Sequence, residues 1–146
     1  MKDRKHIVSL RLTQDDRESI QSIATRLLVK ESYIYRFAIN QLLVRLEKLL
    51  DTSNRGIRLL PLFLDLREEL NYNLGFKKTQ LYNIINFKEL SPENRVSMDD
   101  VELLILPNHA VRSRLAKIHP APETNIDTDA WLKQYFEQKY LLGQGG

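Results

Sequence analysis

Ser9 and Arg11 have the side chains best suited to recognition chemistry near the start of the chain. They occupy alternate positions in residues 6–12, His-Ile-Val-Ser-Leu-Arg-Leu, so a β-strand here would turn both to one face. A serine hydroxyl both donates and accepts hydrogen bonds, and a guanidinium can donate two at once to neighbouring acceptors. Guanine presents such a pair of acceptors in the major groove of DNA, so this strand face is suited to contact base edges.

The sequence offers no comparable set of residues for catalysis or metal binding. It contains no cysteine, which excludes disulfides, thiolate catalysis and cysteine-ligated metals. The three histidines, His6, His109 and His119, share no ligand-like spacing. We interpret the paired acids Asp99 and Asp100 as helix-capping residues, and there is no Gly-rich phosphate loop or nucleophile–base set. We therefore expect a protein that is not an enzyme and that needs no cofactor or metal.

The segment that contains Ser9 and Arg11 has the period-2 pattern of a half-buried strand. Its opposite side is apolar and consists of Val8, Leu10 and Leu12. A lone strand leaves its backbone groups unpaired, and about 50 residues bury too little surface to fold alone. Antiparallel pairing with the same strand of a second copy would satisfy both needs, so we expect a homodimer.

Two helices are predicted after this strand. Thr13 lies three residues before Asp16, which is typical of a helix start, and apolar residues recur at helical spacing over residues 14–28. A longer helix is predicted from Ser32 to Leu50, with an apolar face too wide to be covered from one direction. In a homodimer the wide faces of the two long helices would close a shared core.

The basic residues are concentrated in the first third of the chain. Residues 1–50 hold ten Lys/Arg and six Asp/Glu, a net charge of +4, whereas residues 51–146 hold twelve and thirteen, a net charge of −1. A localised basic excess suits a polyanionic partner such as DNA.

The run of turn-forming residues at 51–56 is the clearest boundary in the sequence. We predict a first module over residues 1–52 and a helical C-terminal lobe over residues 53–146, with a linker at 119–128 and a terminal helix at 129–141. The fold class is therefore mostly α, with one short strand that pairs across the dimer. We expect three aromatic residues of the terminal helix in its core: Trp131, Tyr135 and Phe136.

Residues 4–50 resemble the ribbon-helix-helix family, the class of the Arc and methionine repressors. The strand–helix–turn–helix pattern fits this sequence without a gap and covers about a third of the chain. The resemblance implies an intertwined dimer that binds double-stranded DNA by placing a β-ribbon in the major groove.

The resemblance also implies particular contact residues. Alternating outward residues of the ribbon contact bases in the family, and the corresponding positions here are Ile7, Ser9 and Arg11. Backbone amides at the start of the second helix hold a phosphate in the family, and the corresponding positions here are Lys30, Glu31 and Ser32.

The sequence departs from the family pattern at three positions. Leu28 stands at the turn position commonly filled by glycine, so the first helix must end differently. Lys30 replaces the usual Ser or Thr cap, and a lysine there could itself meet the phosphate. Ile7 is apolar where a polar side chain is usual, which favours contact with a thymine methyl group instead of a base hydrogen bond.

The function that these observations predict is sequence-specific binding to double-stranded DNA, with transcriptional repression as the expected role. Further phosphate contacts are expected from a basic N-terminal arm, although a solvated tail is an alternative for these residues: Lys2, Arg4 and Lys5. Other hypotheses are a plasmid-partition or DNA-transfer accessory protein, an antitoxin whose C-terminal part binds a protein, and an assembly module without a role on DNA. The C-terminal lobe could join dimers or bind a protein partner.

The sequence shows no signal-peptide pattern at its start and no apolar stretch long enough to span a membrane. We therefore expect a cytoplasmic protein without membrane partners.

Overall fold

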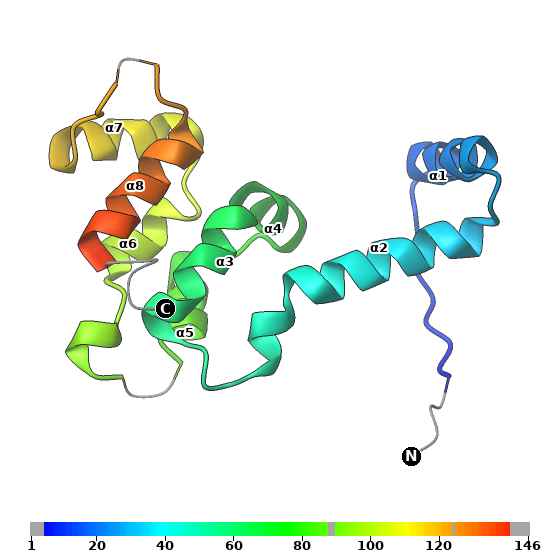
Figure 1. Cartoon of the computed structure of the whole chain (residues 1–146), viewed down its shortest axis with the longest axis horizontal. Helices are drawn as coiled ribbons and strands as arrows, with labels where there is room; N and C mark the ends of the chain where they lie inside the picture. Colours follow the sequence, from blue (N-terminus) through cyan, green and yellow to red (C-terminus); the bar gives the residue numbers. More distant parts are fainter. Residues whose placement is uncertain (1–4, 88–89, 124, 141–146) are drawn as a thin grey trace. The chain divides into compact units, whose positions relative to one another are not determined.

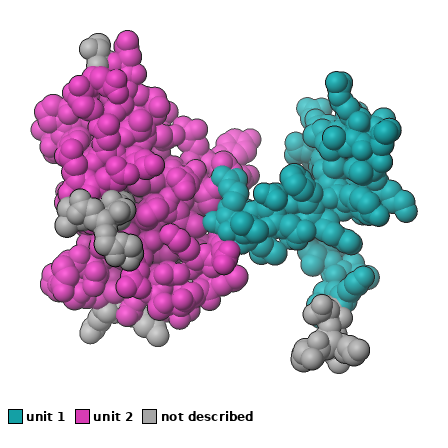
Figure 2. All heavy atoms as spheres, in the orientation of Figure 1, with its two compact units in different colours: residues 1–45 teal, residues 46–146 magenta. Residues whose placement is uncertain are grey.

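The computed structural model describes residues 5–87, 90–123 and 125–140. These residues form eight α-helices and three short 3₁₀-helices and contain no strand, so the mostly α class is confirmed. The chain divides into two compact units, residues 1–45 and residues 46–146 (Figure 2). The division falls seven residues before the predicted boundary between residues 52 and 53. We describe each unit by itself.

Unit 1 begins with an irregular segment in place of the predicted strand. Residues 5–13 form neither helix nor strand before the first helix begins (Figure 1). The predicted strand, and with it the ribbon of the predicted fold class, is therefore wrong for this structure. The physical reason is that a strand needs a partner for its backbone hydrogen bonds, and alternation of side chains does not supply one. Ile7 is 98% exposed, so its segment has no packing surface either.

The two helices of unit 1 follow the sequence pattern closely. Helix α1 spans Gln14–Leu27, and the Thr13 hydroxyl accepts a hydrogen bond from the amide of Asp16 at 3.1 Å, which confirms the predicted N-cap. Helix α2 spans Glu31–Arg45 and ends before the predicted Leu50. A separate 3₁₀-helix, η1, covers Glu47–Leu50 and belongs to unit 2.

Leu28 ends α1 in the left-handed conformation that glycine usually adopts. Its φ is +59°, its amide donates to the Thr25 carbonyl at 3.2 Å, and the next amide, of Val29, donates to the Ala24 carbonyl at 3.0 Å. These two bonds form the Schellman arrangement that satisfies the last helical carbonyls. The chain therefore makes the expected turn with a leucine, whose Cβ is crowded in this conformation.

We predict that Leu28→Gly stabilises unit 1. Glycine removes a left-handed strain of roughly 1–2 kcal/mol and restores about 0.5–1 kcal/mol of unfolded-chain entropy cost, so the net gain should be close to 1 kcal/mol. Leu28 is 91% exposed, so little packing within the chain is lost. Urea denaturation of a residue 1–52 fragment, followed by circular dichroism, measures the change. A clear loss of stability would show instead that Leu28 packs against a second copy.

Unit 2 is an assembly of short helices connected by tight turns. Pro61 lies in the first turn of the first α-helix of the unit, and Gly75, with φ +57°, ends the second. The elements are η2 Gly56–Leu59, α3 Leu60–Asp65, α4 Arg67–Leu74, α5 Lys78–Ile85, η3 Pro92–Asn94, α6 Met98–Leu103, α7 Asn108–Ile118 and α8 Thr128–Tyr140.

The core of unit 2 draws side chains from most of these helices. It includes three aromatic residues of α8 at the positions where the sequence predicted core packing: Trp131, Tyr135 and Phe136. The residues predicted to be a linker are tied to the rest of the unit, because the Trp131 indole donates to the His119 carbonyl at 2.8 Å. Unit 2 therefore has a folded core of its own.

Candidate functional site

Unit 1 leaves most of its apolar side chains exposed. Ala24 is the single buried residue within residues 5–45. Ile39 is 57% exposed and Leu42 is 48% exposed, although both lie in the middle of α2. The other large apolar side chains exposed on the two helices and their turn are Ile23, Leu27, Leu28, Val29, Tyr33, Phe37, Leu43 and Val44.

The area of these side chains is that of an interface. Large aromatic side chains bury roughly 150–250 Å² each, and exposure of about half of each such group gives on the order of 1,000 Å² for the whole set, against about 800 Å² per partner in a stable complex. The largest apolar patch on a typical monomer covers only about 300–600 Å². Unit 1 therefore needs a partner to cover its helices.

The residues predicted to contact bases lie in the irregular segment before α1. Ile7, Ser9 and Arg11 are all exposed there, and the structure pairs the segment with no other strand of the described chain. Lys5 is exposed as well, whereas Lys2 and Arg4 lie outside the described residues. The structure thus keeps these side chains open to a partner, but it does not hold them on a strand face.

The residues predicted to hold a phosphate lie where the sequence placed them, at the start of α2. Glu31 and Ser32 are the first two residues of the helix, and Lys30 precedes them. The amide of Tyr33 donates to the Lys30 carbonyl at 3.0 Å, whereas amides of the first two positions of a helix have no partner inside it. The site therefore has backbone donors and a lysine.

An arginine that the sequence analysis missed also lies at this site. The Arg17 Nε atom of α1 lies 3.2 Å from the Glu31 carboxylate, with both side chains partly exposed. The pair offsets the negative charge that Glu31 would otherwise place beside a phosphate. No sequence signal identifies it, because the two residues are fourteen positions apart and meet only through the turn between the helices.

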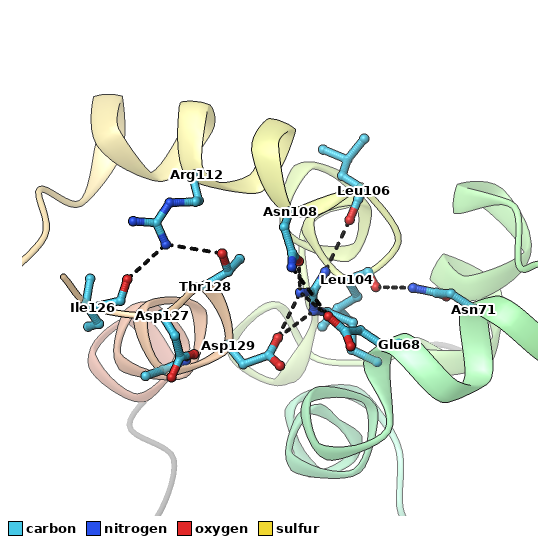
Figure 3. A network of polar contacts seen from close by, with 12 residues as sticks. Glu68, Asn71, Leu104, Leu106, Asn108, Arg112, Ile126, Asp127, Thr128 and Asp129 are labelled. Carbon is cyan, nitrogen blue, oxygen red and sulfur yellow. Dashed lines mark hydrogen bonds and ion pairs between the residues drawn. The ribbon is translucent and has the colours of Figure 1, made fainter.

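The most extensive polar cluster of unit 2 surrounds the buried Arg67 (Figure 3). Its guanidinium donates to Asp129 of α8 at 2.8 Å, to the Leu106 carbonyl at 3.2 Å and to the Asn108 side chain. Nearby, Arg112 donates to the Ile126 carbonyl at 2.9 Å. These contacts join the beginning of α4, the start of α7 and the start of α8. Because every donor has a fixed protein acceptor, we interpret the cluster as structural.

A second buried cluster centres on Asp100, and the helix-capping interpretation of this residue is incomplete. Ser97 caps α6 by accepting from the Asp100 amide, while the Asp100 carboxylate accepts from Tyr135 at 2.6 Å and from Tyr140, and pairs with Lys139 at 2.7 Å. Burial raises the pKa of Asp100, but the bonds from Lys139 and the two tyrosines outweigh it and hold that pKa below its ordinary value. The carboxylate therefore remains charged and links α6 to α8.

The Asp100 cluster is not arranged for catalysis. Burial and the neighbouring carboxylate raise the pKa of Tyr140 to about 12 and that of Tyr135 further, so both phenols stay protonated near neutral pH. Within the described ranges, no three His, Asp or Glu side chains gather as they would to hold a metal ion. Among the same residues, none of the helices has the length and apolar character needed to cross a membrane.

Compared with known proteins, the chain matches no family model, no curated protein and no solved structure. The resemblance of residues 4–50 to the ribbon-helix-helix family therefore rests on the sequence pattern alone.

Proposed function

We propose that the chain is a homodimeric protein that binds double-stranded DNA through unit 1, and that it acts as a transcriptional repressor by occupying its site. The observation that carries the proposal is the combination of two properties in residues 1–45. This small unit exposes nearly all of its apolar side chains, and it also holds the entire basic excess of the chain.

A second copy is the partner that best accounts for the exposed apolar surface. Such a surface costs about 25 cal/mol for each Å² left in water, so burial of on the order of 1,000 Å² per subunit is strongly favourable. Two copies expose the same side chains and can cover each other by a two-fold axis, as most soluble homo-oligomers do. No other chain is needed to complete the core of unit 1.

DNA is the partner that best accounts for the charge. Residues 1–45 contain nine Lys/Arg and five Asp/Glu, a net charge of +4, and a dimer doubles this value. The remaining thirteen Lys/Arg and fourteen Asp/Glu give −1. Arg11 and Ser9 lie on an exposed irregular segment, and such N-terminal arms can contact base edges in a groove. Lys30 and the first amides of α2 supply phosphate contacts, which position the protein.

Unit 2 has a role other than primary DNA contact in this proposal. It has a folded core and no basic excess, so neither its packing nor its charge requires a nucleic acid. Antitoxin segments that fold on binding are poor in apolar residues, and the apolar core of unit 2 argues against that alternative. A folded separate lobe also suits an accessory protein of plasmid partition or DNA transfer, in which it would recruit other proteins.

The test compares two kinds of basic residue on a preferred and a scrambled duplex, after selection of the preferred site from a random DNA pool. Arg11→Ala should weaken binding to the preferred duplex by about 1–3 kcal/mol and to the scrambled duplex much less, because a bidentate base contact is lost. Lys5→Ala should weaken both duplexes alike and lower the salt dependence by ~0.9 log units per phosphate contact. Fluorescence anisotropy at several salt concentrations measures all three values.

Arg58→Ala is the matched control, because Arg58 is an exposed arginine of unit 2. It should leave the affinity for both duplexes unchanged. Equal weakening of both duplexes by Arg11→Ala would show that Arg11 does not read bases. Failure of the pool to enrich any site, together with no binding by the wild type, would remove DNA as the partner.

A further inference from the structure

The middle of α2 has an apolar face whose residues are spaced symmetrically about one point. Tyr35, Ala38, Ile39 and Leu42 follow the i, i+3, i+4, i+7 spacing that puts side chains on one side of a helix. Their order reads alike in both directions about the point between Ala38 and Ile39. A two-fold axis through that point would place Tyr35 against Leu42 of a second copy and Ala38 against Ile39.

Neighbouring residues follow the same symmetry. About that axis the apolar Ile34 meets the apolar Leu43, and the polar Arg36 meets the polar Gln41. Lys30 lies opposite Glu47, which adds an attraction between opposite charges at each end. The small Ala38 side chain at the centre permits the close approach of crossing helices, whose axes pack 8–10 Å apart.

We infer that two copies of the chain cross at α2 by a two-fold axis between Ala38 and Ile39, with Tyr35, Ala38, Ile39 and Leu42 as the contact face. This inference rests on the proposed homodimer and specifies its register. The face is open in the structure, because Ile39 and Leu42 are each about half exposed.

The other apolar side of α2 satisfies the symmetry less well. It consists of Tyr33, Phe37 and Val44, all of them exposed. An axis that pairs Tyr33 with Val44 would bring Phe37 against Asn40, an apolar side chain against an amide, and would put no small residue at the crossing. A second copy is therefore expected on the face that contains Ala38.

Engineered cysteines test this register directly, because the chain contains no cysteine of its own. A disulfide requires Cα atoms within about 7 Å, and in a symmetric dimer a residue approaches its own copy only near the axis. Ala38→Cys in the full chain should therefore form a disulfide-linked dimer under mild oxidation at least about tenfold faster than Asn40→Cys, the control on the opposite side of α2. Tyr35→Cys mixed with Leu42→Cys should cross-link through a short bis-maleimide more than either variant alone.

Analytical ultracentrifugation of Ala38→Ser and of the wild type at micromolar concentration accompanies the cross-linking, since serine matches cysteine in size and cannot cross-link. If both proteins are dimers but Asn40→Cys or Phe37→Cys cross-links faster than Ala38→Cys, the register is wrong and the proposed dimer stands. If the wild type is a monomer, the proposed dimer and the register are both overturned.

Discussion

Ile39→Asp is expected to convert the dimer into monomers and to abolish high-affinity DNA binding. Ile39 lies next to the inferred axis, so the substitution would bury two like charges close together in an apolar interface. Burial of an unpaired carboxylate costs several kcal/mol, and a loss of ~4 kcal/mol raises the dimer dissociation constant about a thousandfold. Sedimentation velocity should show a monomer at micromolar concentration, and anisotropy should show that DNA affinity falls with the loss of the second copy.

Asn40→Asp is the matched control, because it adds the same charge at the next position, on the opposite side of α2. It should remain a dimer and lose only the small affinity that one added negative charge costs. Circular dichroism of both variants separates loss of the dimer from loss of the helix. A dimeric Ile39→Asp protein with normal DNA binding would show that this face of α2 is not the interface.

The helices of unit 1 could be predicted from sequence because their signals are local. The Thr13 cap acts on an amide three residues away, and the helical spacing of apolar residues marks α1 and the start of α2 without reference to the rest of the chain. The turn at Leu28 was located correctly as well, but the sequence could not show that leucine would adopt the left-handed conformation itself.

The strand and the polar clusters could not be predicted reliably because they depend on partners. An alternating pattern over residues 6–12 gives side chains two faces, but the backbone needs a second strand, and the chain supplies none among its described residues. Arg67 meets Asp129 across 62 positions, and Asp100 meets Tyr135 across 35. Neither spacing has a periodic signature, so a charged residue in a helix looked like a solvated or capping one until the fold placed its partner.

Gly56→Ala is expected to be among the most destabilising single substitutions in unit 2. Gly56 has φ +64°, and a Cβ built on it would lie 2.1 Å from the Asn94 carbonyl oxygen, which belongs to the backbone of η3. The alanine would suffer left-handed strain of roughly 1–2 kcal/mol and would force the two backbone segments apart at a further cost of about 1–3 kcal/mol. The free energy of unfolding of unit 2 should therefore fall by about 2–5 kcal/mol.

Gly75→Ala separates the two causes, because Gly75 has nearly the same φ, +57°, but no atom lies within 4 Å of its would-be Cβ. It should lose only the strain, partly offset by about 0.4–1 kcal/mol of reduced unfolded-chain entropy. Trp131 is the only tryptophan and is buried in unit 2, so its fluorescence during urea denaturation reports the unfolding of this unit alone. Equal destabilisation by the two substitutions would mean that the contact between Gly56 and Asn94 contributes nothing beyond backbone strain, whereas the close approach of these segments requires Gly56→Ala to be the more damaging by the cost of separating them.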